Sequence, residues 1–146
     1  MPVDKERITF LLGEIEKALS ILKEFQKEEK AKIIGDPKIL GSVKYYFIVV
    51  MEGCIDVGNH ILSREHRGVP ESYADVFTAL GQNGVLPDSL AQNLAHMAKF
   101  RNLLVHLYSY IKFSNTVFKM LTNLSIILPK DIFKGCTAHN SGYYLV

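Results

Sequence analysis

The chain has 146 residues, of which 48% are apolar and 22% are charged, and its formal net charge at pH 7 is +2. This length suits one domain with enough apolar side chains for a core, which excludes disordered and fibrous proteins. The 17 basic and 15 acidic residues almost cancel. The chain therefore lacks the general positive field of bulk nucleic-acid binders, and any contact with RNA must be local.

The cysteine content and the apolar runs also limit the class of protein. Cys54 and Cys136 are the only cysteines, and they form neither a disulfide framework nor a metal-ligand spacing. The first residues lack an apolar signal core, and no stretch approaches the roughly 18 to 20 apolar residues that span a bilayer. The sequence therefore predicts a cytoplasmic protein without membrane contact.

Apolar positions recur at three- and four-residue steps through residues 3–32, which predicts one long amphipathic helix. A second helix should follow directly, because Asp36 can cap a helix whose first residue is Pro37. We expect this second helix to reach about Ser63. Its apolar positions cover more than one face, so it should be packed on more than one side.

The second half of the chain shows three further helical patterns. A short helix is expected near residues 73–80, ending at a glycine-containing turn, and Pro87 with Asp88 should open a fourth helix that reaches residue 111. Ser114 is a plausible cap for a fifth helix, whose inner face would carry four apolar residues, Val117, Leu121, Leu124 and Leu128.

The fold class follows from these patterns. The chain shows neither a repeat nor an alternating strand pattern between turn signals, so an all-α fold is expected. We predict an up-and-down bundle of four to five helices. Residues 1–128 would form a single domain, and residues 129–146 an irregular C-terminal tail.

The fourth predicted helix carries two side chains suited to cleaving RNA. Such cleavage without a metal ion needs a base for the ribose 2′-hydroxyl and a cation for the phosphorane, and His106 and Arg101 supply these groups. Helical geometry places Asn102 about 40° from His106, but Arg101 about 140° from it. Arg101 could then reach His106 through its flexible stem, through helix distortion, or from a second subunit. On its own, the pair favours a surface ion pair or a hydrogen-bonded core histidine.

A polar stripe on the second predicted helix is the other candidate site. It consists of Glu52, Asp56, Asn59 and His60, at helical spacing on an otherwise apolar helix. A helix that only faces a core would avoid such a stripe. The stripe either lines an active cleft or forms a solvated face, and the sequence leaves both open. We expect no metal site, because His96 and His106 would lie about 15 Å apart along their helix.

A longer string around this pair resembles a known family. Residues 100–108, Phe-Arg-Asn-Leu-Leu-Val-His-Leu-Tyr, are similar to the Arg-Asn-x-Leu-Val-His-x-Tyr signature of the HepT family in the HEPN superfamily. Residues 52–61 resemble the second helix of that family, and residues 70–77 its connecting segment. The resemblance covers roughly residues 3–128, and these segments follow one another in the order and at the spacing that the family shows. The sequence departs from the family pattern after Tyr110, where Ile-Lys-Phe replaces an expected acidic residue.

The resemblance implies a fold, a function and partners. It implies an HEPN-like helical fold and a metal-independent endoribonuclease toxin without a cofactor, acting on single-stranded RNA or tRNA. Arg101 and His106 would be catalytic, and Asn102 would support them. Tyr108 would be adenylylated by a partner antitoxin, a minimal nucleotidyltransferase, and the toxin would be a homodimer whose two motifs face a shared cleft.

One alternative keeps the same fold and the same partner. The protein could be a non-catalytic helical subunit that holds a nucleotide or a substrate for a nucleotidyltransferase. Such a subunit would need Arg101 but not His106, and the chain has both. The sequence therefore favours the enzyme.

Overall fold

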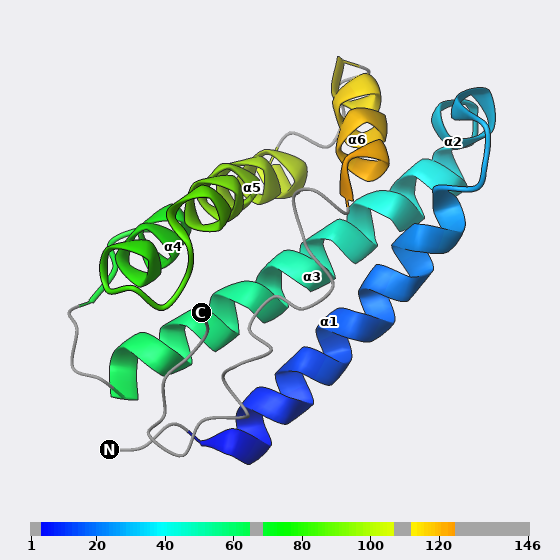
Figure 1. Ribbon diagram of the computed structural model, residues 1–146. Coiled ribbons are helices and arrows are strands. Elements are labelled where there is room, and N and C mark those ends of the chain that lie inside the picture. Colours follow the sequence, from blue (N-terminus) through cyan, green and yellow to red (C-terminus); the bar gives the residue numbers. More distant parts are fainter. Residues whose placement is uncertain (1–3, 65–68, 107–111, 125–146) are drawn as a thin grey trace.

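The computed structural model describes residues 4–64, 69–106 and 112–124. Every regular element in these ranges is an α-helix, which confirms the predicted all-α class (Figure 1). None of these helices is both long and apolar enough to cross a membrane. The helices are α1 (Lys5–Phe25), α2 (Lys30–Gly35), α3 (Pro37–Arg64), α4 (Tyr73–Gln82), α5 (Asp88–His106) and α6 (Lys112–Thr122).

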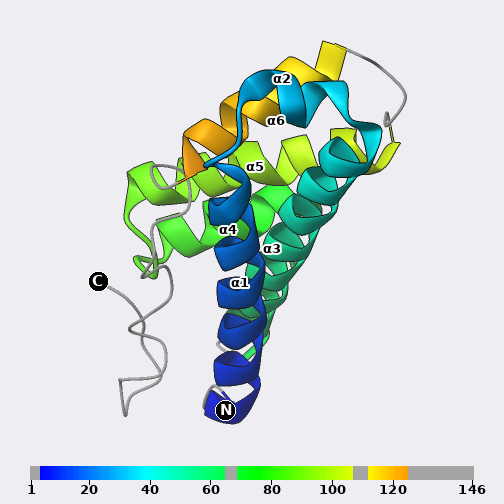
Figure 2. The same ribbon diagram turned by 90° about the vertical axis from the view of Figure 1, so that its right-hand side faces the viewer.

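Helix α3 lies at the centre of the arrangement. Helix α1 runs antiparallel along one side of α3, and the α4–α5 hairpin packs against the other side (Figure 1). The short helix α2 and helix α6 lie next to each other at the end of α3 where the chain enters it (Figure 2). The central position explains why the apolar residues of α3 cover more than one face.

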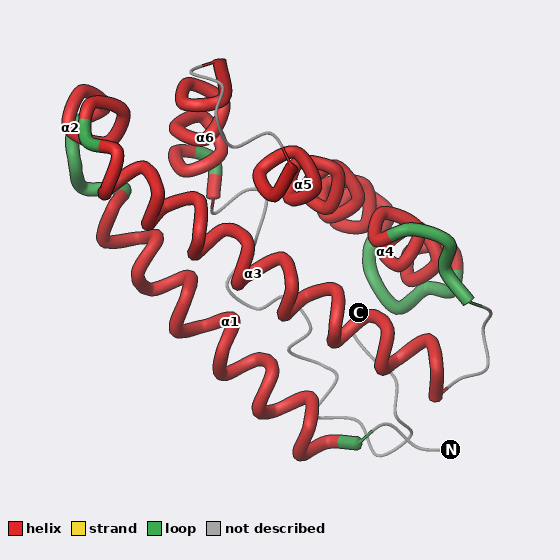
Figure 3. Tube along the Cα trace, turned by 180° about the vertical axis from the view of Figure 1, so that it is seen from behind, coloured by secondary structure: helices red, strands yellow, loops and turns green. Residues whose placement is uncertain are grey.

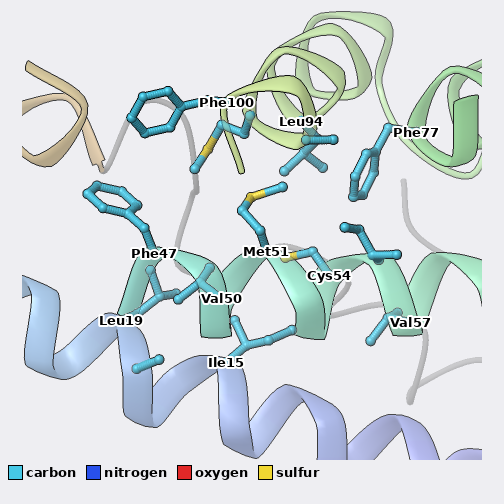
Figure 4. Packing of buried hydrophobic residues seen from close by; sticks show 14 of the residues in the cluster. Ile15, Leu19, Phe47, Val50, Met51, Cys54, Val57, Phe77, Leu94 and Phe100 are labelled. Carbon is cyan, nitrogen blue, oxygen red and sulfur yellow. The ribbon is translucent and has the colours of Figure 1, made fainter. Parts of the chain in front are cut away.

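The core is continuous across α3. In Figure 4, Ile15 and Leu19 of α1 approach α3 from one side, and Leu94 and Phe100 of α5 approach it from the other. The ring of Phe100 meets the ring of Phe47 edge to face, with centroids 6.4 Å apart. A further buried residue of α3, Cys54, has its thiol pKa raised to about 12 by burial, so it remains protonated and unreactive at neutral pH.

Local signals set where several helices begin and end. The Asp36 carboxylate accepts a hydrogen bond from the Lys38 backbone N–H at 2.9 Å, at the predicted start of α3. Ser72 caps α4 in the same way. After α4 the chain turns through Gly84, whose φ of 73° lies in the left-handed region that favours glycine. This turn, green in Figure 3, leads directly into α5 and makes the hairpin.

The prediction of one helix through residue 32 is wrong, because α1 ends at Phe25 and α2 begins only at Lys30. The Gln26 side chain donates to the Leu121 carbonyl of α6 at 2.7 Å, which fixes the turn between the two helices. The break allows α2 to fold against α6 and to bury Ile33. It also gives six helices in the described ranges, where four to five were predicted.

Ser114 does not cap the last helix, contrary to prediction. Helix α6 already begins at Lys112, and Ser114 is a buried residue inside it. The spacing explains this burial, because Ser114 lies on the same helix face as Val117, Leu121 and Leu124. These three residues are buried, as predicted. The remaining predictions for this region, Leu128 and the tail 129–146, lie outside the described residues, and the domain limits stay a prediction.

A histidine fastens the start of α1 to the end of α3. The Asp4 backbone N–H donates to Nε2 of His60 at 3.0 Å, so the ring must be neutral at this nitrogen. Burial lowers the pKa of His60 below its usual 6.5, and the charges of Arg64 and Arg7 lower it further, while Asp4 opposes them. The fold therefore favours the neutral ring.

This arrangement predicts a loss of stability in mild acid. Since the pKa is lower in the folded chain than in the unfolded chain, the contribution of His60 is complete above about pH 6.5 and is lost as the pH falls below it. The urea midpoint of unfolding should fall between pH 7 and pH 5. His60→Gln should reduce this fall, and an equal fall in both proteins would contradict the assignment.

The close approach of α4 to α3 depends on Gly58. A Cβ at this position would lie 2.5 Å from Cγ1 of Val76, a β-branched residue with little freedom to rotate in a helix. Gly58→Ala should therefore cost about 1 to 3 kcal/mol in overpacking, against a gain of about 1 kcal/mol in helix propensity. Gly41→Ala is the matched control on α3, because nothing lies within 4 Å of its Cβ. Urea unfolding should show Gly41→Ala more stable and Gly58→Ala less stable than wild type.

Candidate functional site

Arg101 lies near the end of α5 with its side chain only 15% exposed. Its Nε donates to Oε1 of Glu52 on α3 at 2.8 Å, and its Nη2 donates to the same oxygen. Its Nη1 donates to Oδ1 of Asn102 at 3.1 Å. The Tyr73 ring of α4 lies 5.0 Å from the guanidinium carbon. Three helices therefore hold this one cation.

These contacts determine what the guanidinium of Arg101 can still do. A charge with so little access to water needs a paired anion, and Glu52 supplies it. The contact with Tyr73 adds about 0.5 to 2 kcal/mol. Of the five N–H groups of an arginine, the contacts within the described residues use three. The other two N–H groups have no partner among the described residues, and they suit an anion such as a phosphate.

A pocket of about 480 Å³ opens beside this arginine. The volume is within the usual range for sites that bind small molecules. His106 lies on its wall with an exposed side chain. Arg101 and His106 of a single chain therefore line the same pocket, although they are about 140° apart around α5. The full lining is Asn59, Pro70, Glu71, Ser72, Tyr73, Val76, Arg101, Asn102 and His106.

The polar stripe of α3 is divided between different surroundings. Glu52 binds Arg101, and Asn59, about 20° away around the helix, lines the pocket. Asp56 is exposed, and partial removal from water, followed by the charge of Glu52, raises its pKa above 3.8. His60 lies about 80° from Glu52 and binds the Asp4 backbone instead. The helical rotation across the stripe explains this division.

The sequence did not single out the contribution of residues 70–73. The short helix expected near residues 73–80 implied no role for the Tyr73 side chain, yet its ring contacts Arg101. The available signal was Ser72, since a capping residue places the next side chain at the very start of a helix, beside the incoming loop. Tyr108 lies outside the described residues. Among those that are described, no group of three or more His, Cys, Asp or Glu side chains could hold a metal ion.

Comparison with known proteins adds a family to this geometry. The family model for HepT-like ribonucleases, "Ribonuclease HepT-like", matches residues 15–129. The mRNA nuclease HepT of Shewanella oneidensis is 44% identical over 57 residues, which is 39% of this chain and 43% of that protein. The chain therefore matches less than half the length of this curated relative.

Two solved structures resemble about four fifths of the chain. A chain in a crystal structure of a mutant of the toxin–antitoxin pair MntA–HepT is 27% identical, with a TM-score of 0.71 over 80% of this chain and 86% of that one. The tri-AMPylated Shewanella oneidensis HEPN toxin in complex with MNT antitoxin gives 24% identity and a TM-score of 0.66, over 81% and 95%. At that identity the second likeness shows a shared fold.

Proposed function

Because the chain belongs to the HepT-like ribonuclease family, we propose that it is an endoribonuclease toxin that cuts RNA at the pocket beside Arg101. The observation that supports this proposal most strongly is the placement of a cation, an amide and an imidazole on one pocket wall. These groups belong to Arg101, Asn102 and His106. The match to an mRNA nuclease points to the same class of substrate.

The proposed reaction uses the 2′-hydroxyl of the RNA as the nucleophile. His106 accepts the proton of this hydroxyl, the 2′-oxygen bonds to phosphorus, and the bond from phosphorus to the 5′-oxygen breaks. The departing 5′-oxygen takes up a proton from water, and the other product carries a 2′,3′-cyclic phosphate. The two remaining N–H groups of Arg101 stabilise the negative charge of the phosphorane. Base and cation both come from the chain, so this reaction requires no metal ion.

The proposal includes a partner and a means of control. A structure similar to this chain is that of a toxin–antitoxin pair. We propose that a minimal nucleotidyltransferase antitoxin adenylylates Tyr108, which adds a negative charge and bulk. The sequence spacing of seven residues corresponds to about 20° in an ideal helix, so positions 101 and 108 are compatible with one shared ligand. The added phosphate would then compete with RNA for the arginine. The toxin would act in the cytoplasm as a homodimer, on single-stranded RNA or tRNA.

The principal test is His106→Ala. This variant should lose RNA cleavage by at least about a hundredfold, in the range typical of a lost general base, while its urea midpoint stays unchanged because the side chain is exposed. RNA cleavage should be measured on protein shown by intact mass to carry no adenylyl group, with and without a chelator. If unmodified wild-type protein leaves RNA intact, the result would favour the alternative function. In that case the chain is a non-catalytic helical subunit that holds a nucleotide or a substrate for a nucleotidyltransferase.

A second variant tests the support of the arginine. Glu52→Gln removes the paired anion but keeps a similar shape, so Arg101 should lose its fixed position. A displacement of about 1 Å at a reacting group can cost up to about a hundredfold, and we expect kcat to fall about 10- to 100-fold. Glu14→Gln is the matched control, because Glu14 pairs with Lys17 on the exposed face of α1. Equal kcat values for the two variants would show that Glu52 does not position the cation.

A further inference from the structure

A second cavity, of about 310 Å³, lies between α4 and α5. Small residues of both helices are part of its lining and allow the helices to approach closely: a Cβ on Gly81 would lie 2.7 Å from Cβ of Ala91. Its rim is polar. We name this cavity the α4–α5 groove, and its lining is Thr78, Gly81, Gln82, Asp88, Ala91, Gln92, Ala95, His96 and Lys99.

The groove faces the same side of α5 as His106. Gln92, His96, Lys99 and His106 fall within an arc of about 80° around α5, and all four side chains are exposed. The helical rise places Lys99 about 10 Å and His96 about 15 Å from His106 along the axis. A linear ligand whose reacting bond lies at His106 could therefore continue along α5 into the groove.

The charges in the groove are ordered along its length. Lys99 lies at the end nearest His106, and Asp88 lies about 16 Å farther along α5. The rim between them consists of amides, a hydroxyl and an imidazole, supplied by Gln82, Gln92, Thr78 and His96. This order suits a polyanion that enters from the site of cleavage. Lys99 would bind a phosphate, and the amides would bind the edges of unpaired bases.

The composition of the groove argues against a protein as its occupant. Interfaces between proteins are centred on buried aromatic and aliphatic anchors. The exposed large apolar residues of the described part of the chain are Phe10, Tyr45, Val69, Tyr73 and Leu103, and none of them lines the groove.

We propose that the α4–α5 groove is a subsite for the RNA strand that flanks the bond cut at His106. The inference rests on the proposed ribonuclease function and extends it, because it assigns the path of the substrate beyond the reacting nucleotides. Lys99 contacts a phosphate of this flanking strand. The carboxylate of Asp88 repels phosphates, so the bound part of the strand ends before Asp88. Residues in the groove therefore contribute to binding and not to chemistry.

The test compares Lys99→Ala with Lys23→Ala, which removes an exposed lysine from α1 on the other side of α3. Cleavage should be measured on a dinucleotide and on a single-stranded RNA of about 12 nucleotides. Lys99→Ala should raise KM for the long RNA about three- to tenfold, with kcat unchanged and with no effect on the dinucleotide. Lys23→Ala should change none of these values. Equal effects of the two variants, or an effect of Lys99→Ala on the dinucleotide, would overturn the groove assignment.

Binding measurements separate this proposal from the ribonuclease function. Fluorescence anisotropy of the labelled 12-nucleotide RNA on the His106→Ala protein reports binding without turnover. Adding Lys99→Ala should lower the slope of log K against log salt by about 0.7 to 1, the value for one lost phosphate contact. Lys99-dependent binding without any cleavage by wild type would refute the enzyme and keep the groove only as an RNA-binding surface. Cleavage with Lys99-independent binding would refute the groove and keep the enzyme, and RNA that is neither bound nor cut would refute both.

Discussion

The ion pair between Arg101 and Glu52 is the interaction on which the site depends. It joins α5 to α3, and it places a carboxylate against a guanidinium whose side chain is only 15% exposed. The planar fork of an arginine suits this task, because Nε and Nη2 can point at one carboxylate while Nη1 points elsewhere. A lysine could not divide its donors in this fixed geometry. The pair thus supports the fold and orients the cation at the same time.

The packing around α3 makes this pair possible. Gly53 and Gly58 lie one and six residues after Glu52, and a Cβ at either position would come within 2.5 Å of a side chain of α1 or α4. These two glycines allow α1 and α4 to approach α3 closely on its two sides. The approach of α4 carries Tyr73 to the face of Arg101. Small residues in the central helix therefore determine how the pocket is closed on the side of α4.

Much of this arrangement could be predicted from local patterns, and the rest depends on tertiary contacts. The start of α3 at Pro37 follows from its capping aspartate, and the burial of Val117, Leu121 and Leu124 follows from helical spacing. The break after Phe25 could not be predicted, because the residues that follow it are good helix formers and the turn is fixed by contact with α6. Nor could the spacing within α5 show that Arg101 and His106 share a pocket. That depends on where Glu52 and the segment before α4 lie.

The balance of charge in the chain explains why its binding groups are so localised. With 17 basic and 15 acidic residues the whole molecule would attract the proposed RNA substrate only weakly, so affinity would have to come from a few placed cations. Glu52 already offsets part of the charge of Arg101, and among the described residues two N–H groups of this guanidinium make no hydrogen bond. In the proposed mechanism such a site binds the phosphorane of the transition state, which carries more negative charge, more strongly than it binds the phosphodiester of the bound substrate. A site of this kind is also easily silenced, because a single added phosphate is enough to satisfy the remaining donors of Arg101.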